Sequence, residues 1–315
     1  MLIKNLKPYE DIEGKFVVKF KKPVTSYANG YAFQLRIGDS SGEIMLKYWG
    51  DNNEEEVRRL YDSIKKDDII YIKGKTTVYG NKIEITVDKE GIIKVLKPEE
   101  YDLKEFIKVT EKDIESMFKE IKAYANSVKN EYLKKVLELF INDFDFVKKF
   151  KNQPAAMYKH HSWIGGLLEH TLNVVKICDF ITNLYPELDR DLIITGAILH
   201  DIGKIKEFEL KTSIRTSTEG MLIGHTILGI EELIKRLEKI EIPELYRIKL
   251  IHIILSHHGK MEYGAAKTPA FPEALAIFFA DFMDAKVAEM IMHKKTAETE
   301  DDYVYTREFG NVYLK

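Results

Sequence analysis

The sequence predicts a multidomain chain in which a small all-β barrel precedes an all-helical domain. The length of 315 residues is more than one hydrophobic core usually needs. Residues 1–96 contain short β-rich runs separated by turn signals, whereas apolar residues from 112 onward recur almost entirely at helical spacing. Pro98 and the charged residues after it predict a linker at 97–111, so we expect domains at 1–96 and 112–315.

The β-rich part predicts five strands, at 16–18, 31–37, 44–46, 69–72 and 83–87. Asn29-Gly30, Asp39-Ser40-Ser41-Gly42 and Gly80-Asn81 supply turns between them. A charged stretch at 54–66 predicts a helix between the third and fourth strands. Five strands with a helix in that position are typical of an OB-type barrel.

The second part predicts helices at roughly 111–127, 130–150, 162–184, 189–200, 225–239, 244–257 and 272–297. Thr110 has the residue type and position of a helix cap. Pro154, Pro186, Pro243 and Pro272 fall between the predicted helices, as helix breakers do. Residues 205–224 alternate in polarity and contain several threonines, which predicts a hairpin or an ordered loop.

Composition limits the broad class of the protein. The net charge of −3 excludes a general attraction to nucleic acid, so any such contact needs a local patch. The single cysteine, Cys178, lies in an apolar helical stretch and excludes an intrachain disulfide framework. Neither a signal-peptide run nor the roughly 20 apolar residues of a membrane span occurs, so we expect a cytoplasmic protein without membrane contact.

Histidines and aspartates interrupt the apolar faces of several predicted helices. His170 lies in the stripe Trp163, Leu167, Val174, Ile177 and Ile181, while His200 and Asp281 occupy inward positions on two other helices. A single inward histidine is more often a hydrogen-bonded core residue than a ligand. Burying several imidazoles and two carboxylates without partners would cost a few kcal/mol each, and a metal centre satisfies them together.

The donor set indicates which metals fit. Imidazoles and carboxylates without thiolates suit Mn²⁺, Fe²⁺, Co²⁺, Ni²⁺, Zn²⁺ or Mg²⁺. Six ligands exceed the needs of one tetrahedral zinc, so we predict two divalent ions bridged by an aspartate.

The order of these residues resembles the HD superfamily of metal-dependent phosphohydrolases. The strings that carry the resemblance are Gly166-Leu167-Leu168-Glu169-His170-Thr171, Leu199-His200-Asp201-Ile202-Gly203-Lys204, Gly224-His225 and Ser256-His257-His258-Gly259, followed by Asp281. The barrel before them and the total length resemble the YhaM-type 3′-to-5′ exoribonucleases over essentially the whole chain. This resemblance implies hydrolysis of single-stranded RNA to 5′-mononucleotides, with Mn²⁺ or Co²⁺ favoured.

The resemblance also implies roles for individual residues. His170, His200, Asp201 and Asp281 would hold the first metal, with Asp201 bridging to a second metal held by His225 and His257. His258 is either a further ligand, a substrate contact or a residue that orients a ligand. Lys204 would stabilise charge that develops on the phosphate, so Asp201 and Lys204 are the expected catalytic residues.

Further residues are candidates for substrate contact. His160 and His161 precede the first ligand helix, where they would either face the cleft or have a structural role. Arg215 lies in the irregular segment and would contact a nucleotide backbone, although a solvated arginine is the ordinary interpretation. Asp284 is assigned to a different helical face from Asp281 and is left out of the predicted site.

The barrel offers aromatic and basic residues suited to single-stranded nucleic acid. We select Tyr31, Lys47 and Trp49 as contacts and assign Phe33 to the barrel core. Residues 1–100 contain 18 Lys and Arg against 17 Asp and Glu, so the predicted interaction is weak.

Two other functions remain open at this point. One is an HD hydrolase of a small nucleotide such as a dNTP or a cyclic dinucleotide, although the Gly-Tyr-Pro string of the latter enzymes is replaced by Gly259-Lys260-Met261. The other is a nucleic-acid-binding protein with weak nuclease activity. RNA is the expected partner, with DNA and a homo-oligomer as further options.

Overall fold

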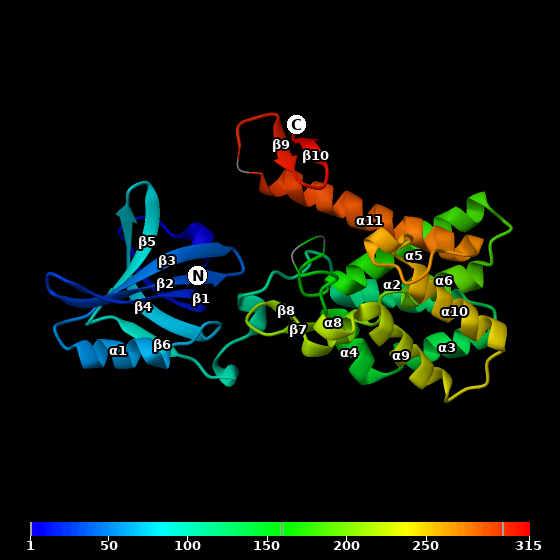
Figure 1. Ribbon diagram of the computed structural model, residues 1–315, viewed down its shortest axis with the longest axis horizontal. Helices are drawn as coiled ribbons and strands as arrows, with labels where there is room; N and C mark the ends of the chain where they lie inside the picture. Colours follow the sequence, from blue (N-terminus) through cyan, green and yellow to red (C-terminus); the bar gives the residue numbers. More distant parts are fainter. Residues whose placement is uncertain (1, 158, 160, 298) are drawn as a thin grey trace. The chain divides into compact units, whose positions relative to one another are not determined.

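The computed structural model describes residues 2–157, 159, 161–297 and 299–315 (Figure 1). His160, one of the predicted substrate contacts, lies outside the described residues. The chain forms two compact units, Met1–Lys108 with Leu210–Ser213, and Val109–Glu209 with Ile214–Lys315. Among the described residues, no helix combines the length and the apolarity needed to cross a membrane.

The first unit contains a closed barrel, which confirms the predicted OB-type fold. Its elements are β1 (Asp11–Tyr27), β2 (Gly30–Asp39), β3 (Gly42–Trp49), α1 (Glu54–Ser63), β4 (Ile69–Tyr79), β5 (Lys82–Asp88) and β6 (Ile92–Val95). The order β1-β2-β3-β5-β4 closes because β1 also pairs with β4. β1 is long enough to do both, and register shifts after Val18 and Lys22 allow it to bend.

Alternation along the strands fills the barrel interior. Phe33, Leu35 and Ile37 point inward from β2 and are fully or almost fully buried, which confirms the assignment of Phe33 to the core. β6 was not predicted, because four residues after a charged turn give too short a pattern.

The second unit is mostly helical, as expected. Its helices are α2 (Ile114–Ser127), α3 (Glu131–Ile141), α4 (Phe144–Asn152), α5 (Gly166–Leu184), α6 (Arg190–Leu199), α7 (Lys204–Glu207), α8 (Thr218–Leu222), α9 (His225–Leu237), α10 (Glu244–Ser256) and α11 (Pro272–Thr296). Short 3₁₀ turns occur at Met261–Tyr263 in this unit and at Ile3–Asn5, Pro98–Glu100 and Leu103–Glu105 in the first unit.

Capping explains where the helices depart from the prediction. The helix expected at 130–150 is two helices, because Asp143 accepts a hydrogen bond from the Phe146 amide and starts α4. The prediction of Thr110 as a cap was wrong: Asp113 caps α2, while the Thr110 hydroxyl donates to Glu169.

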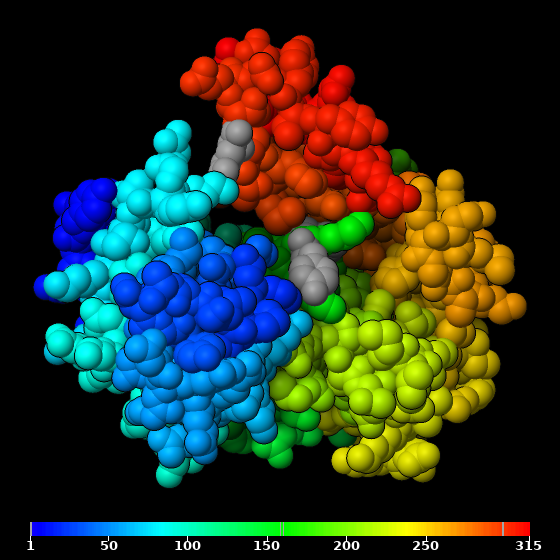
Figure 2. All heavy atoms as spheres, turned by 60° about the vertical axis from the view of Figure 1, so that its left-hand side comes forward, coloured from blue at the N-terminus to red at the C-terminus, as the bar shows by residue number. Residues whose placement is uncertain are grey.

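Two hairpins interrupt the predicted all-helical domain. β7 (Phe208–Leu210) and β8 (Ile214–Thr216) form the hairpin that was one of the two options for residues 205–224. β9 (Tyr303–Thr306) and β10 (Gly310–Tyr313) form a second hairpin that the sequence did not predict. This hairpin lies against the C-terminal half of α11, as Figures 1 and 2 both show.

Candidate metal centre

The helical unit brings the predicted histidines and aspartates together from five helices. His170 lies on α5, His200 and Asp201 follow the end of α6, and His225 begins α9. His257 and His258 follow the end of α10, and Asp281 lies in the middle of α11. His170, His200, Asp201 and His257 are almost inaccessible to solvent, so the group lies in the interior of the unit.

The local fold fixes the position of the His200–Asp201 pair. Every residue of α6 from Leu192 to Leu199 is buried, which indicates a helix surrounded by neighbours on all sides. Gly196 permits this close packing, because a methyl group there would lie 2.7 Å from the side chains of Ile253 and Ile277. The end of α6 therefore delivers His200 and Asp201 into the core rather than to the surface.

The two carboxylate oxygens of Asp201 face different histidines. Oδ2 lies 3.5 Å from Nε2 of both His170 and His200. Oδ1 lies 3.5 Å from Nε2 of His257 and 3.6 Å from Nε2 of His225. A carboxylate placed between two imidazole groups in this way has the arrangement needed to bridge two cations.

Hydrogen bonds orient four of the imidazole rings. The Nδ1 atoms of His200 and His257 donate to the Ala197 and Ile254 carbonyl oxygens, at 2.8 and 2.7 Å. Nδ1 of His170 donates to Asp284, and Nδ1 of His225 donates to Glu207 at 3.0 Å. Because these acceptors fix the proton on Nδ1, each Nε2 is directed inward as a potential ligand.

The inward Nε2 atoms are placed to bind cations rather than to form hydrogen bonds with one another. Nε2 of His170 lies 3.3 Å from Nε2 of His200, and Nε2 of His225 lies 3.2 Å from Nε2 of His258. Two nitrogen lone pairs at such a distance repel unless a proton or a cation lies between them. Among the described residues, three sets have donor atoms that all lie within 4.8 Å of one another: His170–His200–Asp201, His161–His170–Asp284 and His225–His257–His258. Both histidines of the doublet therefore belong to one set.

The histidines of the group differ in protonation. Burial lowers the pKa of His200 to about 4 and that of His258 to about 3, which keeps both rings neutral. Burial alone would raise the pKa of Asp201, but Lys204 and His200 hold it well below its usual range. Burial also opposes the charge on His170 and His257, but hydrogen bonds to Asp201, and for His170 also to Asp281 and Asp284, raise the pKa of both rings. A divalent cation binds neutral imidazole, so it would displace a proton from these two histidines.

Lys204 lies inside the group rather than at its rim. Its ammonium is 2.5 Å from Asp201 Oδ2, in an ion pair that lacks hydrogen-bond alignment, and the residue is only 9% exposed. Burial opposes the charge, but Asp201 and Asp281 raise the pKa of Lys204, so the amine stays protonated. A fixed positive charge therefore lies beside the carboxylate at the centre of the site.

Asp284 was wrongly left out of the predicted site. Its Oδ2 accepts hydrogen bonds from His170 Nδ1 at 2.6 Å and His161 Nε2 at 2.9 Å, and its Oδ1 accepts from Asn173 at 2.8 Å. Residues three apart on a helix are neighbours, so the spacing from Asp281 to Asp284 was the available signal. Asp284 thus fixes the ring of His170, whose Nε2 lies 3.1 Å from Asp281 and 3.5 Å from Asp201.

For His161 the structure fits the structural role, which was one of the two options. The residue is 3% exposed and its Nε2 is bonded to Asp284, so it supports the ligand layer from behind instead of facing substrate. Its φ of 53° is unusual for a residue with a side chain. Its carbonyl oxygen would lie 2.0 Å from a methyl group on Gly166, which explains why glycine starts α5.

Replacing Asp284 with asparagine tests this supporting role. We expect the affinity for divalent cations to fall roughly 10- to 100-fold, because the amide is a poorer acceptor for the His170 Nδ1 proton. Titration of the cation-free protein with Mn²⁺ by calorimetry measures the change. Asp179→Asn, which alters an aspartate paired with Arg190 away from the site, is the control. Unchanged Mn²⁺ affinity in D284N would exclude the role.

Gly203, in the His-Asp string, permits α9 to approach closely. A methyl group at residue 203 would lie 1.9 Å from the His225 carbonyl oxygen and 2.5 Å from the Gly229 amide nitrogen. The backbone of Gly203 itself is in the ordinary helical region, so space alone requires glycine. Gly203 therefore sets the distance of His225 from Asp201.

We expect Gly203→Ala to displace α9 and to lower the free energy of unfolding by roughly 1–3 kcal/mol or more. Gly42→Ala is the control, because its φ is not positive and the atom nearest to the added methyl group, on the Ile3 side chain, lies 3.8 Å away. Urea unfolding monitored by circular dichroism compares the two, and equal losses would contradict the steric argument.

The barrel separates the three predicted RNA contacts. Lys47 and Trp49 lie two residues apart on β3, whereas the Tyr31 hydroxyl is hydrogen-bonded to Glu54 of α1 and its ring packs on the barrel core. Two tyrosines are their neighbours: Tyr27 lies edge-on to Trp49 at 4.9 Å between ring centroids, and Tyr79, which the sequence did not indicate, lies under the Lys47 ammonium at 4.1 Å. Lys47 also pairs with Glu84 at 2.6 Å.

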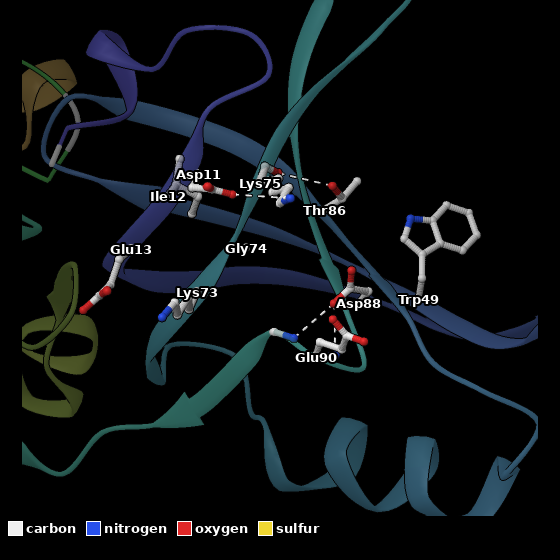
Figure 3. Close-up of a pocket in the computed structure, with 11 residues that line it drawn as sticks. Asp11, Ile12, Glu13, Trp49, Lys73, Gly74, Lys75, Thr86, Asp88 and Glu90 are labelled. Atoms are coloured by element: carbon white, nitrogen blue, oxygen red, sulfur yellow. Dashed lines mark hydrogen bonds and ion pairs between the residues drawn. The ribbon is translucent and has the colours of Figure 1, made fainter.

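A groove of about 570 Å³ opens beside Trp49 on the barrel (Figure 3). Four carboxylates and two ammonium groups line it, from Asp11, Glu13, Asp88, Glu90, Lys73 and Lys75. The excess of negative charge opposes a phosphate backbone in the groove. Arg215, the remaining predicted contact, lies half-buried on β8 in the other unit.

Comparison with known proteins also distinguishes an N-terminal barrel from a C-terminal helical domain. Residues 17–96 match the family model of the OB-fold nucleic acid binding domain, and residues 167–286 match that of the HD domain. The 3′-5′ exoribonuclease YhaM of Bacillus subtilis strain 168 is 31% identical over 266 residues, which are 84% of this chain and 81% of that protein. The protein of the same name from Bacillus velezensis is 30% identical over 301 residues, covering 94% and 91% of the two chains.

Proposed function

Because this chain belongs to the YhaM family of 3′-5′ exoribonucleases, we propose that it is a metal-dependent nuclease that shortens single-stranded RNA from the 3′ end. The observation that carries the proposal is Asp201, whose two oxygens face two separate histidine groups. This arrangement suits hydrolysis at phosphorus by paired cations.

The proposed ligand sets follow from the distances. His170, His200 and Asp281 would hold one cation with Asp201 Oδ2, and His225, His257 and His258 would hold the other with Oδ1. The two ions would lower the pKa of a bound water and neutralise phosphate oxygens. Mn²⁺ is the ion we propose on the strength of the family resemblance, and the imidazole and carboxylate donors without thiolate are compatible with it.

The chain's own residues then have distinct tasks. Asp284 and Glu207 fix the rings of His170 and His225, and the Ala197 and Ile254 carbonyls fix those of His200 and His257. Lys204 holds a positive charge beside Asp201, where it would stabilise the charge that develops on the phosphate. Water would attack the phosphorus of each terminal phosphodiester and the P–O3′ bond would break, with the 3′ oxygen of the shortened RNA as the leaving group. The phosphate then stays on the 5′ oxygen of the released nucleotide, so the products would be 5′-mononucleotides.

The barrel is the proposed guide for RNA. Trp49 with Tyr27 offers aromatic surface for stacking, and Lys47 with Tyr79 offers a cation next to a ring. We propose RNA as the substrate in preference to DNA on the strength of the family. The small-nucleotide alternative has no structural feature in its favour among the described residues.

RNA labelled at the 5′ end tests the direction of cleavage. With Mn²⁺ the label should move through a ladder of progressively shorter products, while RNA labelled at the 3′ end should release a labelled mononucleotide first. RNA with a 3′-phosphate and a panel of dNTPs and cyclic dinucleotides are tested as further substrates. Early release of mononucleotide from the 5′ end, or hydrolysis of the small nucleotides alone, would refute the proposal.

A further inference from the structure

The exposed face of α11 is entirely apolar over four helical turns. Every exposed residue of the helix between Leu275 and Ile291 is a large hydrophobic one, and each is 43–55% exposed: Leu275, Phe279, Met283, Val287, Met290 and Ile291. The opposite face of the same helix is buried against the core through Ala274, Ile277 and Ala280. α11 is thus apolar on two sides, which is typical of a helix buried on both.

Another surface helix shows what a solvated face looks like in this protein. The exposed positions of α2 are mostly polar or charged: Glu115, Ser116, Lys119, Glu120, Ala123 and Asn126. On α11, the one lysine within the stretch, Lys286, is half-buried and paired with Glu289 and Glu308. The contrast indicates that the exposed face of α11 is built for contact with protein.

The spacing on α11 forms one continuous ridge. Leu275, Phe279, Met283, Val287 and Ile291 are each four residues apart, and Met290 fills the side of the ridge. Six half-exposed side chains of this size present on the order of 500 Å² of apolar surface, at the upper end of the largest patches on monomeric proteins. A standard interface buries about 800 Å² per partner, so the ridge would supply most of one.

The ridge is suited to a copy of itself. It is symmetric about Met283, so a two-fold axis there places Leu275 beside Ile291 and Phe279 beside Val287 of the second chain. No exposed charge lies in the stretch to oppose that pairing. RNA is a poor occupant for the same reason, since it requires exposed cations.

The β9–β10 hairpin adds a suitable rim. It packs on α11 and carries three exposed tyrosines, Tyr303, Tyr305 and Tyr313. Tyrosine is enriched at interfaces, where its ring packs and its hydroxyl remains in contact with water. We propose that two copies of this chain associate through the α11 ridge, with antiparallel helices and Met283 on the two-fold axis. This association is independent of the proposed RNA hydrolysis.

Mass measurement tests the interface. Light scattering on size-exclusion chromatography should give the unaltered protein a mass of at least two chains, and Met283→Glu should lower that mass by breaking the contact. Val287→Glu, one turn away, should act in the same way, and Lys119→Glu on α2 should leave the mass unchanged. Circular dichroism checks that the variants are folded.

Cross-linking identifies the axis. Cys178 is buried and is the only cysteine in the sequence, so it contributes little background. Met283→Cys should form a covalent dimer with a short bis-maleimide, and Lys119→Cys should not. The proposal would be overturned if the unaltered protein were a monomer, or if M283E and V287E left its mass unchanged. It would also be overturned if the thiol introduced in M283C were protected from maleimide while the protein remained a monomer.

Discussion

Asp201→Asn is expected to lower kcat/KM for single-stranded RNA by about 10³-fold or more. Asp201 is the one residue whose oxygens face both histidine groups, at 3.5–3.6 Å, among the described residues. An amide keeps the shape of the side chain but replaces one oxygen with a donor group that cannot bind a cation. The bound metal should therefore fall from about two ions per chain. Steady-state kinetics and elemental analysis of the purified protein measure the two effects.

Asp179→Asn makes the same chemical change at a partly exposed ion pair with Arg190, and should retain both metal and activity. Circular dichroism should show both variants folded. A D201N protein with wild-type metal content and wild-type kcat/KM would remove Asp201 from the centre of the site. Loss of activity with full metal content would instead place Asp201 in the chemistry without a bridging role.

The spacing of residues along the chain was enough to predict the innermost part of the site. His170, His200 and Asp281 each interrupt an apolar helical face, and the structure buries those faces against one another. Alternation and turn residues likewise predicted the barrel, because inward residues such as Phe33 and Leu35 follow the period of a strand. These features are local, so the sequence displays them directly.

Features that depend on contacts between distant segments were not predictable in this way. Glu207 orients His225 across 18 residues of chain, and Asp284 orients His170 across 114. Glu207 does not differ in sequence from a solvated carboxylate, and the only sequence signal for Asp284 is its helical spacing from Asp281. The close approach of Gly203 to His225, and the position of Tyr31 against α1 instead of beside Trp49, likewise depend on the tertiary fold.

Short elements were missed for another reason. β6 and the β9–β10 hairpin have only four residues per strand, and so short an alternation cannot be distinguished from a loop. Their identity is decided by the neighbour on which they pack. For the hairpin that neighbour is α11. The outer face of α11 is exposed, but its apolar composition is that of a buried face.

Lys204→Met is expected to change activity and metal affinity in different ways. The ammonium lies 2.5 Å from Asp201 Oδ2, the oxygen that also faces His170 and His200. Without it, kcat should fall about 10²- to 10³-fold, because a preorganised positive charge is lost. Affinity for Mn²⁺ should stay the same or increase, since a like charge next to the cations has been removed.

The stability of the K204M variant distinguishes a role of Lys204 in the reaction from a role as counter-ion to Asp201 alone. The cation-free K204M protein should unfold more easily, by roughly 3 kcal/mol, because Asp201 loses its buried partner. Added Mn²⁺ should restore more stability to the variant than to the unaltered protein. Lys206→Met, two residues along α7, removes an ammonium that pairs with Glu232 outside the site and is the matched control.

Three measurements on K204M therefore decide between two roles. A lower kcat with undiminished Mn²⁺ affinity assigns Lys204 to the reaction, as we propose. An unchanged kcat in the Mn²⁺-loaded variant, together with lower stability of the cation-free form, would reduce Lys204 to a charge that balances Asp201 until the metal binds. Weaker Mn²⁺ binding would contradict both, because it requires the ammonium to favour cations at a distance where like charges repel.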